Sequence, residues 1–160
     1  MMRFVCAAAI CAGAYMLGQT YVGCVREAIQ TIESFRALAH HLVSAVQFSG
    51  TGVKKALLTV RQGGAARFSQ ELGASDDLLA AFAAFRPRGK TEAACVRFME
   101  ESIGLAAKSS DGAEVAGAFA HAEQELLLFK QQTEEATNGK RKTAPRAALA
   151  VGLFLAIIVI

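Results

Sequence analysis

The sequence predicts an all-α protein: a six-helix antiparallel bundle flanked by an N-terminal transmembrane helix and a short C-terminal membrane helix. Two observations lead to this prediction. Uncharged, apolar stretches occupy residues 4–25 and 147–160 of the 160-residue chain. Between them, apolar residues recur at spacings of three and four, the period of a helix, without the alternation typical of strands. The predicted parts are a transmembrane segment at 1–25, a helical bundle at 26–139, a basic juxtamembrane segment at 140–146 and a membrane helix at 147–160.

The first segment is long enough to cross a bilayer, which takes about 20 apolar residues. Its only strongly polar side chain between residues 4 and 25 is Gln19. Two alternatives remain open at this point. Ala12-Gly13-Ala14 has the form of a signal-peptide cleavage site, and Cys24 stands where a lipoprotein signal would end. Either alternative would make the protein an exported or lipid-anchored helical binding protein with a cleaved signal segment.

Six helical stretches are predicted between residues 26 and 139, because apolar residues repeat along one face of each. They cover about 26–47, 53–60, 65–72, 76–85, 91–106 and 113–137. No helix breaker separates the first from the apolar N-terminal segment, so one long helix over residues 4–48 is expected. The apolar faces predict a core that contains Phe35, Leu42, Leu57, Phe82, Phe98, Phe119 and Leu126.

Turn and capping residues predict where these helices begin and end. Glycine, proline and serine breaks occur at residues 49–52, 63–64, 86–89 and 109–112. Ser75 and Thr91 are the expected N-caps of the fourth and fifth helices, because their hydroxyls can accept from the free N–H groups of a first turn. Asn138-Gly139 is expected to end the sixth helix. Pro145 suits the first turn of the terminal apolar helix.

The distribution of basic residues predicts the orientation in the membrane. Of 17 Lys and Arg residues, only Arg3 precedes the first apolar stretch and none follows the second. Arg26 and a basic cluster border the bundle instead. This cluster consists of Lys140, Arg141, Lys142 and Arg146. The positive-inside rule then predicts a multi-pass protein of the cell membrane, with the helical domain in the cytoplasm and both termini outside.

The same basic cluster is expected to bind the headgroups of anionic lipids, so the lipid bilayer is a predicted partner. Nucleic acid is the competing ligand for a basic run. It is not expected here, because no aromatic residue is interleaved with the charges and an apolar segment follows them.

Side chains that could carry chemistry are scattered. His40 and His41 are adjacent, so they point about 100° apart on a helix and cannot share a metal as an i, i+4 pair can. His121 has Glu123 two residues on, which faces another way. The four cysteines include no CxxC pair, and Gly63-Gly64 lacks the Lys and Ser/Thr of a phosphate loop. We therefore expect a protein that is not an enzyme and that uses no metal or cofactor.

Two sets of residues are predicted contact surfaces. Small residues repeat every four positions in the terminal apolar helix, and such a ladder lets a second helix approach closely. The ladder consists of Ala148, Gly152 and Ala156, preceded by Ala144. In the first loop of the bundle, Thr51, Lys54 and Lys55 are the predicted contacts with a protein partner. Homo-oligomer formation also remains open.

Two short patches carry a family resemblance. The first is Phe48-Ser49-Gly50-Thr51-Gly52-Val53-Lys54-Lys55-Ala56, similar to the pattern aromatic-Gly-x-Thr-Pro-Leu-x-Glu-Ala, with Gly52 and Lys55 in place of the Pro and the Glu. The second is Ile103-Gly104 followed by Asp111, similar to an aromatic-Gly and Leu-Gly-x-x-Asp turn. With the layout of the whole chain, these patches resemble the stage III sporulation protein AB family.

The resemblance implies a domain similar to the cytoplasmic domains of the type II secretion inner-membrane protein F. It also implies a place in the sporulation-associated, secretion-like channel complex between mother cell and forespore. The partners would be an ATPase and other membrane subunits of that complex. The expected function is then a non-enzymatic, membrane-anchored assembly or adaptor subunit.

Overall fold

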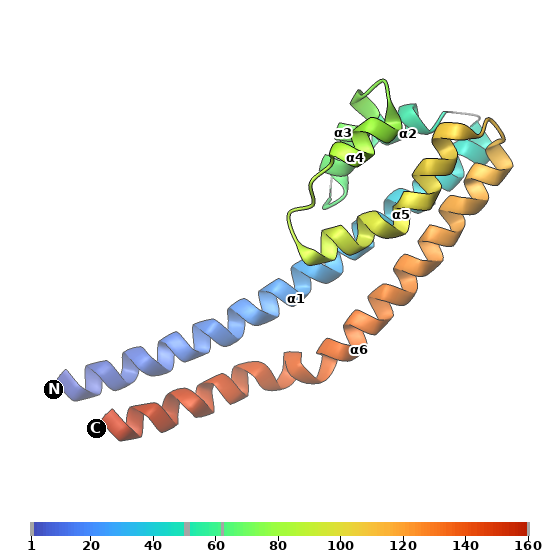
Figure 1. Ribbon diagram of the computed structural model, residues 1–160. Helices are drawn as coiled ribbons and strands as arrows, with labels where there is room; N and C mark the ends of the chain where they lie inside the picture. Colours follow the sequence, from blue (N-terminus) through green and yellow to red (C-terminus); the bar gives the residue numbers. More distant parts are fainter. Residues whose placement is uncertain (1, 50–51, 62, 160) are drawn as a thin grey trace. The chain divides into compact units, whose positions relative to one another are not determined.

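The computed structural model describes the backbone of residues 2–49, 52–61 and 63–159, with all their side chains except those of 2–5, 7, 49, 140–142 and 158–159. Within these residues the protein is all-helical, with six helices and no strand (Figure 1). The helices are α1 (Met2–Ser49), α2 (Val53–Thr59), α3 (Ala66–Ala74), α4 (Leu78–Ala84), α5 (Lys90–Lys108) and α6 (Gly112–Val159). The predicted all-α class, with one long apolar N-terminal helix, is confirmed.

The chain divides into two compact units. The helical unit is Ala28–Gln131, which contains α2 to α5 and the adjoining parts of α1 and α6. The terminal unit consists of Met1–Glu27 and Gln132–Ile160, the outer parts of α1 and α6. Each unit has its own packing.

α1 is one helix, as the missing breaker predicted, but the predicted end of the sixth helix at Asn138-Gly139 is wrong. α6 continues through both residues and through Pro145, which was expected to begin a separate helix. A proline inside a helix costs about 3 kcal/mol, because one hydrogen bond is lost and the preceding turn is crowded. Pro145 lies at a close contact inside the terminal unit: a Cβ built on Gly18 of α1 would lie only 2.9 Å from the Cα of Pro145.

The core of the helical unit forms where the apolar faces of its helices meet. Of the predicted core residues, Phe35, Leu42, Leu57, Phe119 and Leu126 are fully buried. Phe82 and Phe98 are only partly buried and pack against the outside of that core. Two turns of α4 are too few to bury a residue fully. Phe98 instead pairs with Phe129, with 5.5 Å between the ring centres.

Phe68 is the centre of an aromatic cluster that joins three segments of the helical unit. Its ring centre lies 5.3 Å from that of Phe35 and 5.1 Å from that of Phe85. The guanidinium of Arg67 lies over the Phe85 ring at 4.4 Å. It also donates to the Arg86 carbonyl at 2.8 Å and to Glu92 Oε1 at 3.1 Å. Arg67 therefore fastens the connection between α4 and α5, a role that the sequence pattern did not reveal.

The caps of α4 and α5 differ from those predicted. Asp77, not Ser75, caps α4: its Oδ1 accepts from the backbone N–H groups of Leu79 and Ala80, at 2.9 and 3.1 Å. A carboxylate suits this place because it also faces the positive end of the helix dipole. Ser75 ends α3 and donates to the Asp77 carbonyl at 3.0 Å. α5 begins at Lys90 without a side-chain cap, so Thr91 lies inside the helix.

Cys95 on α5 should resist thiol reagents in the folded protein. Its side chain has no exposed surface, and burial raises the pKa of the thiol from 9.0 to about 12. The thiolate is the reactive form, so alkylation is expected only after unfolding. Because the folded pKa is the higher one, this thiol stabilises the fold fully below pH 9.0, and the contribution is lost as the pH rises toward about 12.

The extent of alkylation at Cys95 is measured by peptide mass spectrometry after brief treatment of the folded protein with iodoacetamide. Ser110→Cys, at an exposed position of the same unit, supplies the matched control thiol, which should be alkylated quickly. Equal labelling rates at Cys95 and at the introduced thiol would contradict the burial of Cys95.

Candidate functional site

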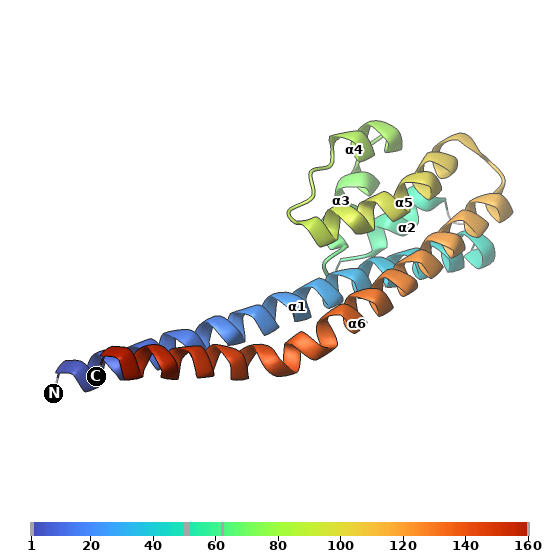
Figure 2. The same ribbon diagram turned by 60° about the horizontal axis from the view of Figure 1, so that its bottom comes forward.

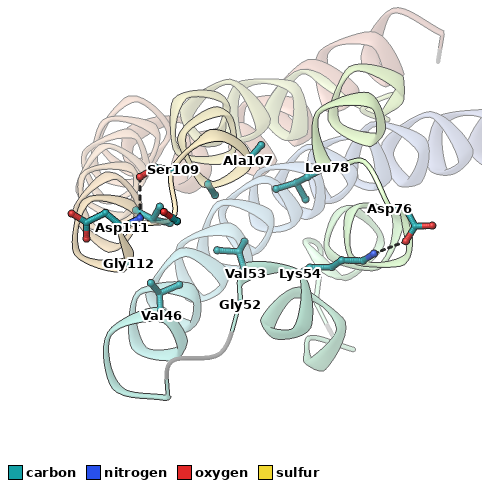
Figure 3. Close-up of a pocket in the computed structure, with 13 residues that line it drawn as sticks. Val46, Gly52, Val53, Lys54, Asp76, Leu78, Ala107, Ser109, Asp111 and Gly112 are labelled. Carbon is teal, nitrogen blue, oxygen red and sulfur yellow. Dashed lines mark hydrogen bonds and ion pairs between the residues drawn. The ribbon is translucent and has the colours of Figure 1, made fainter.

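A groove of about 560 Å³ opens in the helical unit where the start of α2 meets the loop between α5 and α6. Figure 3 shows side chains from five elements around it. Gly52 and the start of α2 supply one wall, and the segment Ser109–Gly112 faces it. The segment Ser109–Gly112 joins α5 to α6, so the groove lies beside the junction of these two helices.

The floor of the groove is apolar. Val46, Val53 and Leu78 are partly buried and pack against the main core, and Val115 beneath them is buried. Small alanines of α5 line the opposite side, which leaves room above these side chains. The groove therefore offers apolar surface that the unit itself does not cover.

The rim of the groove is polar. Lys54 Nζ lies 2.8 Å from Asp76 Oδ1 at one edge. The hydrogen bond from Lys54 lowers the pKa of the Asp76 carboxyl below its ordinary value. At the other edge, Asp111 Oδ1 accepts from the N–H of Ala113 at 2.9 Å and so caps the start of α6. Asp111 is thus engaged with its own backbone, whereas the exposed Lys54–Asp76 pair is free to exchange partners at low cost.

The histidines lie outside this groove. His40 Nδ1 is 3.2 Å from Glu123 Oε2, and His41 Nε2 is 2.8 Å from Thr59 Oγ1. These contacts are exposed, and the two rings have different partners, as adjacent helical positions require. In the part of the chain that the structure describes, no group of three His, Cys, Asp or Glu side chains could hold a metal ion. The chemistry offered by the groove is binding of an apolar surface beside an ion pair.

The predicted partner contacts have different positions. Lys54 lines the groove, and Lys55 is exposed but does not line it. Thr51 lies outside the described residues. The two patches behind the family resemblance border the same groove, one through Gly52 and the other through Asp111. The sequence did not indicate that Asp76 and Leu78 line the groove, because the pattern around them indicates only the beginning of a helix.

The terminal unit is an antiparallel pair of helices. The beginning of α1 and the end of α6 lie at the same end of this unit in both views (Figures 1 and 2). A Cβ built on Gly152 would lie 2.8 Å from the Cβ of Ala14, and one built on Gly18 would lie 3.3 Å from the Cβ of Ala148. Gly152 and Ala156 of the predicted ladder are buried, and Ala148 is half-buried.

Of the predicted headgroup-binding cluster, Arg146 is exposed. The side chains of Lys140, Arg141 and Lys142 lie outside those that the structure describes. Among the described residues, one stretch, Ala8–Phe48 in α1, is long and apolar enough to cross a membrane, and only 11 % of its most apolar window is buried. The core helix of a soluble domain would be mostly buried, whereas a signal sequence would meet the same criterion.

Comparison of the chain with protein-family models, with curated proteins and with solved structures finds no match. The resemblance described above therefore rests on the residues of the two patches.

Proposed function

We propose that the chain is a non-enzymatic assembly or adaptor subunit, anchored in a membrane by its terminal unit. The observation that carries this proposal is the apolar exterior of that unit. Large apolar side chains face outward from both helices, while small residues fill the contact between them. The outward-facing residues are Met16, Leu17, Leu149, Val151, Leu153, Phe154, Leu155 and Ile157.

This arrangement is the reverse of a soluble helix pair, which buries large apolar residues between its helices. Transfer of such a side chain from water to an apolar environment is favourable by about 1.5–3 kcal/mol when complete. Eight of them would make a water-exposed surface prone to aggregation. The acyl chains of a bilayer would remove all eight side chains from water without a protein partner.

The packing between the two helices favours an uncleaved N-terminal segment over the exported alternative. Removal of the chain up to Cys24 would uncover Gly152 and Ala156, which are buried in the terminal unit. Retention of both helices gives the protein two membrane segments. The positive-inside rule then supports a cytoplasmic helical unit, because Arg26 and the basic cluster lie on its side of the apolar stretches.

The groove is the proposed contact with the partner. It combines an apolar floor with the exposed Lys54–Asp76 pair, the composition of a small protein-binding site. The resemblance to the stage III sporulation protein AB family makes that partner an ATPase or membrane subunit of the channel complex between mother cell and forespore. The meeting of both resembling patches at the groove supports this choice of surface.

Two measurements test the proposal. The full-length protein should stay with the membranes after a carbonate wash, with the intact mass of the uncleaved chain; release into the supernatant would rule out the anchor. A photo-crosslinking residue at Lys54 should capture a subunit of a membrane complex. The same residue at the neighbouring Lys55, off the groove, is the matched control, and equal capture at both would rule out the groove as the contact.

A further inference from the structure

The two helices of the terminal unit have a defined register. Gly18 lies against residues 144–148, since its nearest neighbours are Pro145, Ala148 and Ala144. Four residues earlier in α1, Ala14 lies against Gly152, four residues beyond Ala148. The register is therefore constant along the pair, and Arg146 is at the level of Gly18.

This register exposes a conflict between the two apolar stretches. Along α1, the first charge after the apolar stretch is Arg26, eight residues beyond Gly18. At about 1.5 Å per residue, Arg26 lies roughly 12 Å from the level of Arg146. A membrane surface at Arg26 would place the exposed Arg146 well inside the hydrocarbon, at a cost of about 2.5–3.5 kcal/mol if it reached the bilayer centre. The membrane surface therefore cannot lie at Arg26 on α1 and at Arg146 on α6 at the same time.

Polar side chains of α1 resolve the conflict. Tyr15 and Tyr21 are 45 % and 40 % exposed on the outside of the unit, and tyrosine is enriched at membrane–water interfaces. Gln19 Nε2 donates to the Tyr15 hydroxyl at 2.9 Å. An amide side chain has two donors and two acceptor sites, so this single bond leaves most of its capacity for water or lipid headgroups. Gln19 would be costly in hydrocarbon and is well placed at an interface.

We propose that the membrane–water interface crosses the terminal unit at the level of Gly18 and Arg146, not at Arg26. Phosphate-bearing lipid headgroups contact Arg146 on one helix and the Tyr15–Gln19–Tyr21 belt on the other. This inference rests on the proposed membrane anchor and specifies how deeply the terminal unit enters the bilayer. Residues 4–14 of α1 then lie in the hydrocarbon, about 17 Å of helix, and residues 15–25 lie in the headgroup layer or beyond it.

The chain contains no tryptophan, so a single introduced tryptophan reports its own depth. Full-length Tyr15→Trp, Tyr21→Trp and Phe154→Trp are reconstituted in vesicles of phosphatidylcholine and phosphatidylglycerol. Fluorescence quenching is compared between lipids brominated near the headgroup and lipids brominated near the middle of the acyl chains. We expect Tyr15→Trp and Tyr21→Trp to be quenched more by the shallow bromines, and Phe154→Trp more by the deep ones.

A membrane surface at Arg26 predicts the opposite for Tyr15→Trp, because residue 15 lies near the centre of residues 4–25. Stronger quenching by the deep bromines at that position would overturn the inference while leaving the anchor intact. Absence of quenching at all three positions would instead overturn the membrane anchor itself.

Matched charge removals test the role of Arg146. In the Tyr15→Trp background, Arg146→Leu should shift quenching toward the deep bromines, because the charge that holds the helix pair at this level is gone. Arg26→Leu should leave the ratio of shallow to deep quenching unchanged. The reverse pattern would show that Arg26 sets the depth and would overturn the inference.

Discussion

Replacement of Phe119 by Asp should unfold the helical unit. Phe119 has no exposed surface and lies in the main core. Loss of a buried phenylalanine alone costs about 3–5 kcal/mol, and an unpaired buried carboxylate adds several more. The whole stability of a domain is about 5–15 kcal/mol, so most of the unit should be unfolded. Hydrogen exchange of the full-length protein, followed by mass spectrometry of peptides from residues 28–131, measures this loss of protection.

Leu128→Asp is the matched control, because Leu128 is 57 % exposed on the same helix and in the same unit. It should change the free energy of unfolding by no more than about 0.5 kcal/mol. Phe119→Leu, which keeps the site apolar, should preserve most of the protection. If the amide hydrogens of residues 28–131 exchanged equally fast in the Phe119→Asp and Leu128→Asp variants, the assignment of the core-facing side of α6 would be wrong.

The second large effect is expected for Gly18→Leu and Gly152→Leu in the terminal unit. A Cβ at either glycine would lie closer than 3.0 Å to the opposite helix, against backbone at Pro145 or the Cβ of Ala14. Neither neighbour can rotate away, so the two helices must separate. Overpacking of this kind costs about 1–3 kcal/mol, which corresponds to roughly 5- to 150-fold faster exchange of the protected amides in residues 8–20 and 144–156.

Gly13→Leu and Gly23→Leu are the matched controls on the same helix. A Cβ at either glycine meets nothing within 4 Å, and leucine favours helix over glycine by somewhat less than about 1 kcal/mol. Exchange in the terminal unit should therefore stay the same or slow down. Equal acceleration by Gly13→Leu and Gly18→Leu would show that the contact between α1 and α6 does not depend on the small residue.

The positions of most helices could be predicted from local sequence. α2, α3, α4 and α5 occur within a few residues of their predicted ranges, because glycine and proline breaks separate stretches of helical period. Caps were harder, because both Ser75 and Asp77 can cap a helix. The backbone path decided between them: Ser75 bonds to the Asp77 carbonyl, and Asp77 is left to accept from the first turn of α4.

The groove could be predicted only in part. Lys54 was singled out from its loop, but its partner Asp76 is 22 residues away in the sequence. No local sequence pattern predicts this ion pair, because it depends on how α2 and α3 bring the two residues together in the fold. The aromatic cluster around Phe68 and the Arg67 contact that fastens it have the same origin.

The sequence by itself determined the helical character of the chain, its apolar faces and its two apolar stretches, since periodicity and composition are local properties. The tertiary structure alone decided that α6 continues through Pro145 and that Gly18 stands level with Arg146. Both depend on the register between helices that are more than a hundred residues apart in the chain. A residue's depth and neighbours follow from that register, because close contact at small residues fixes one helix against another.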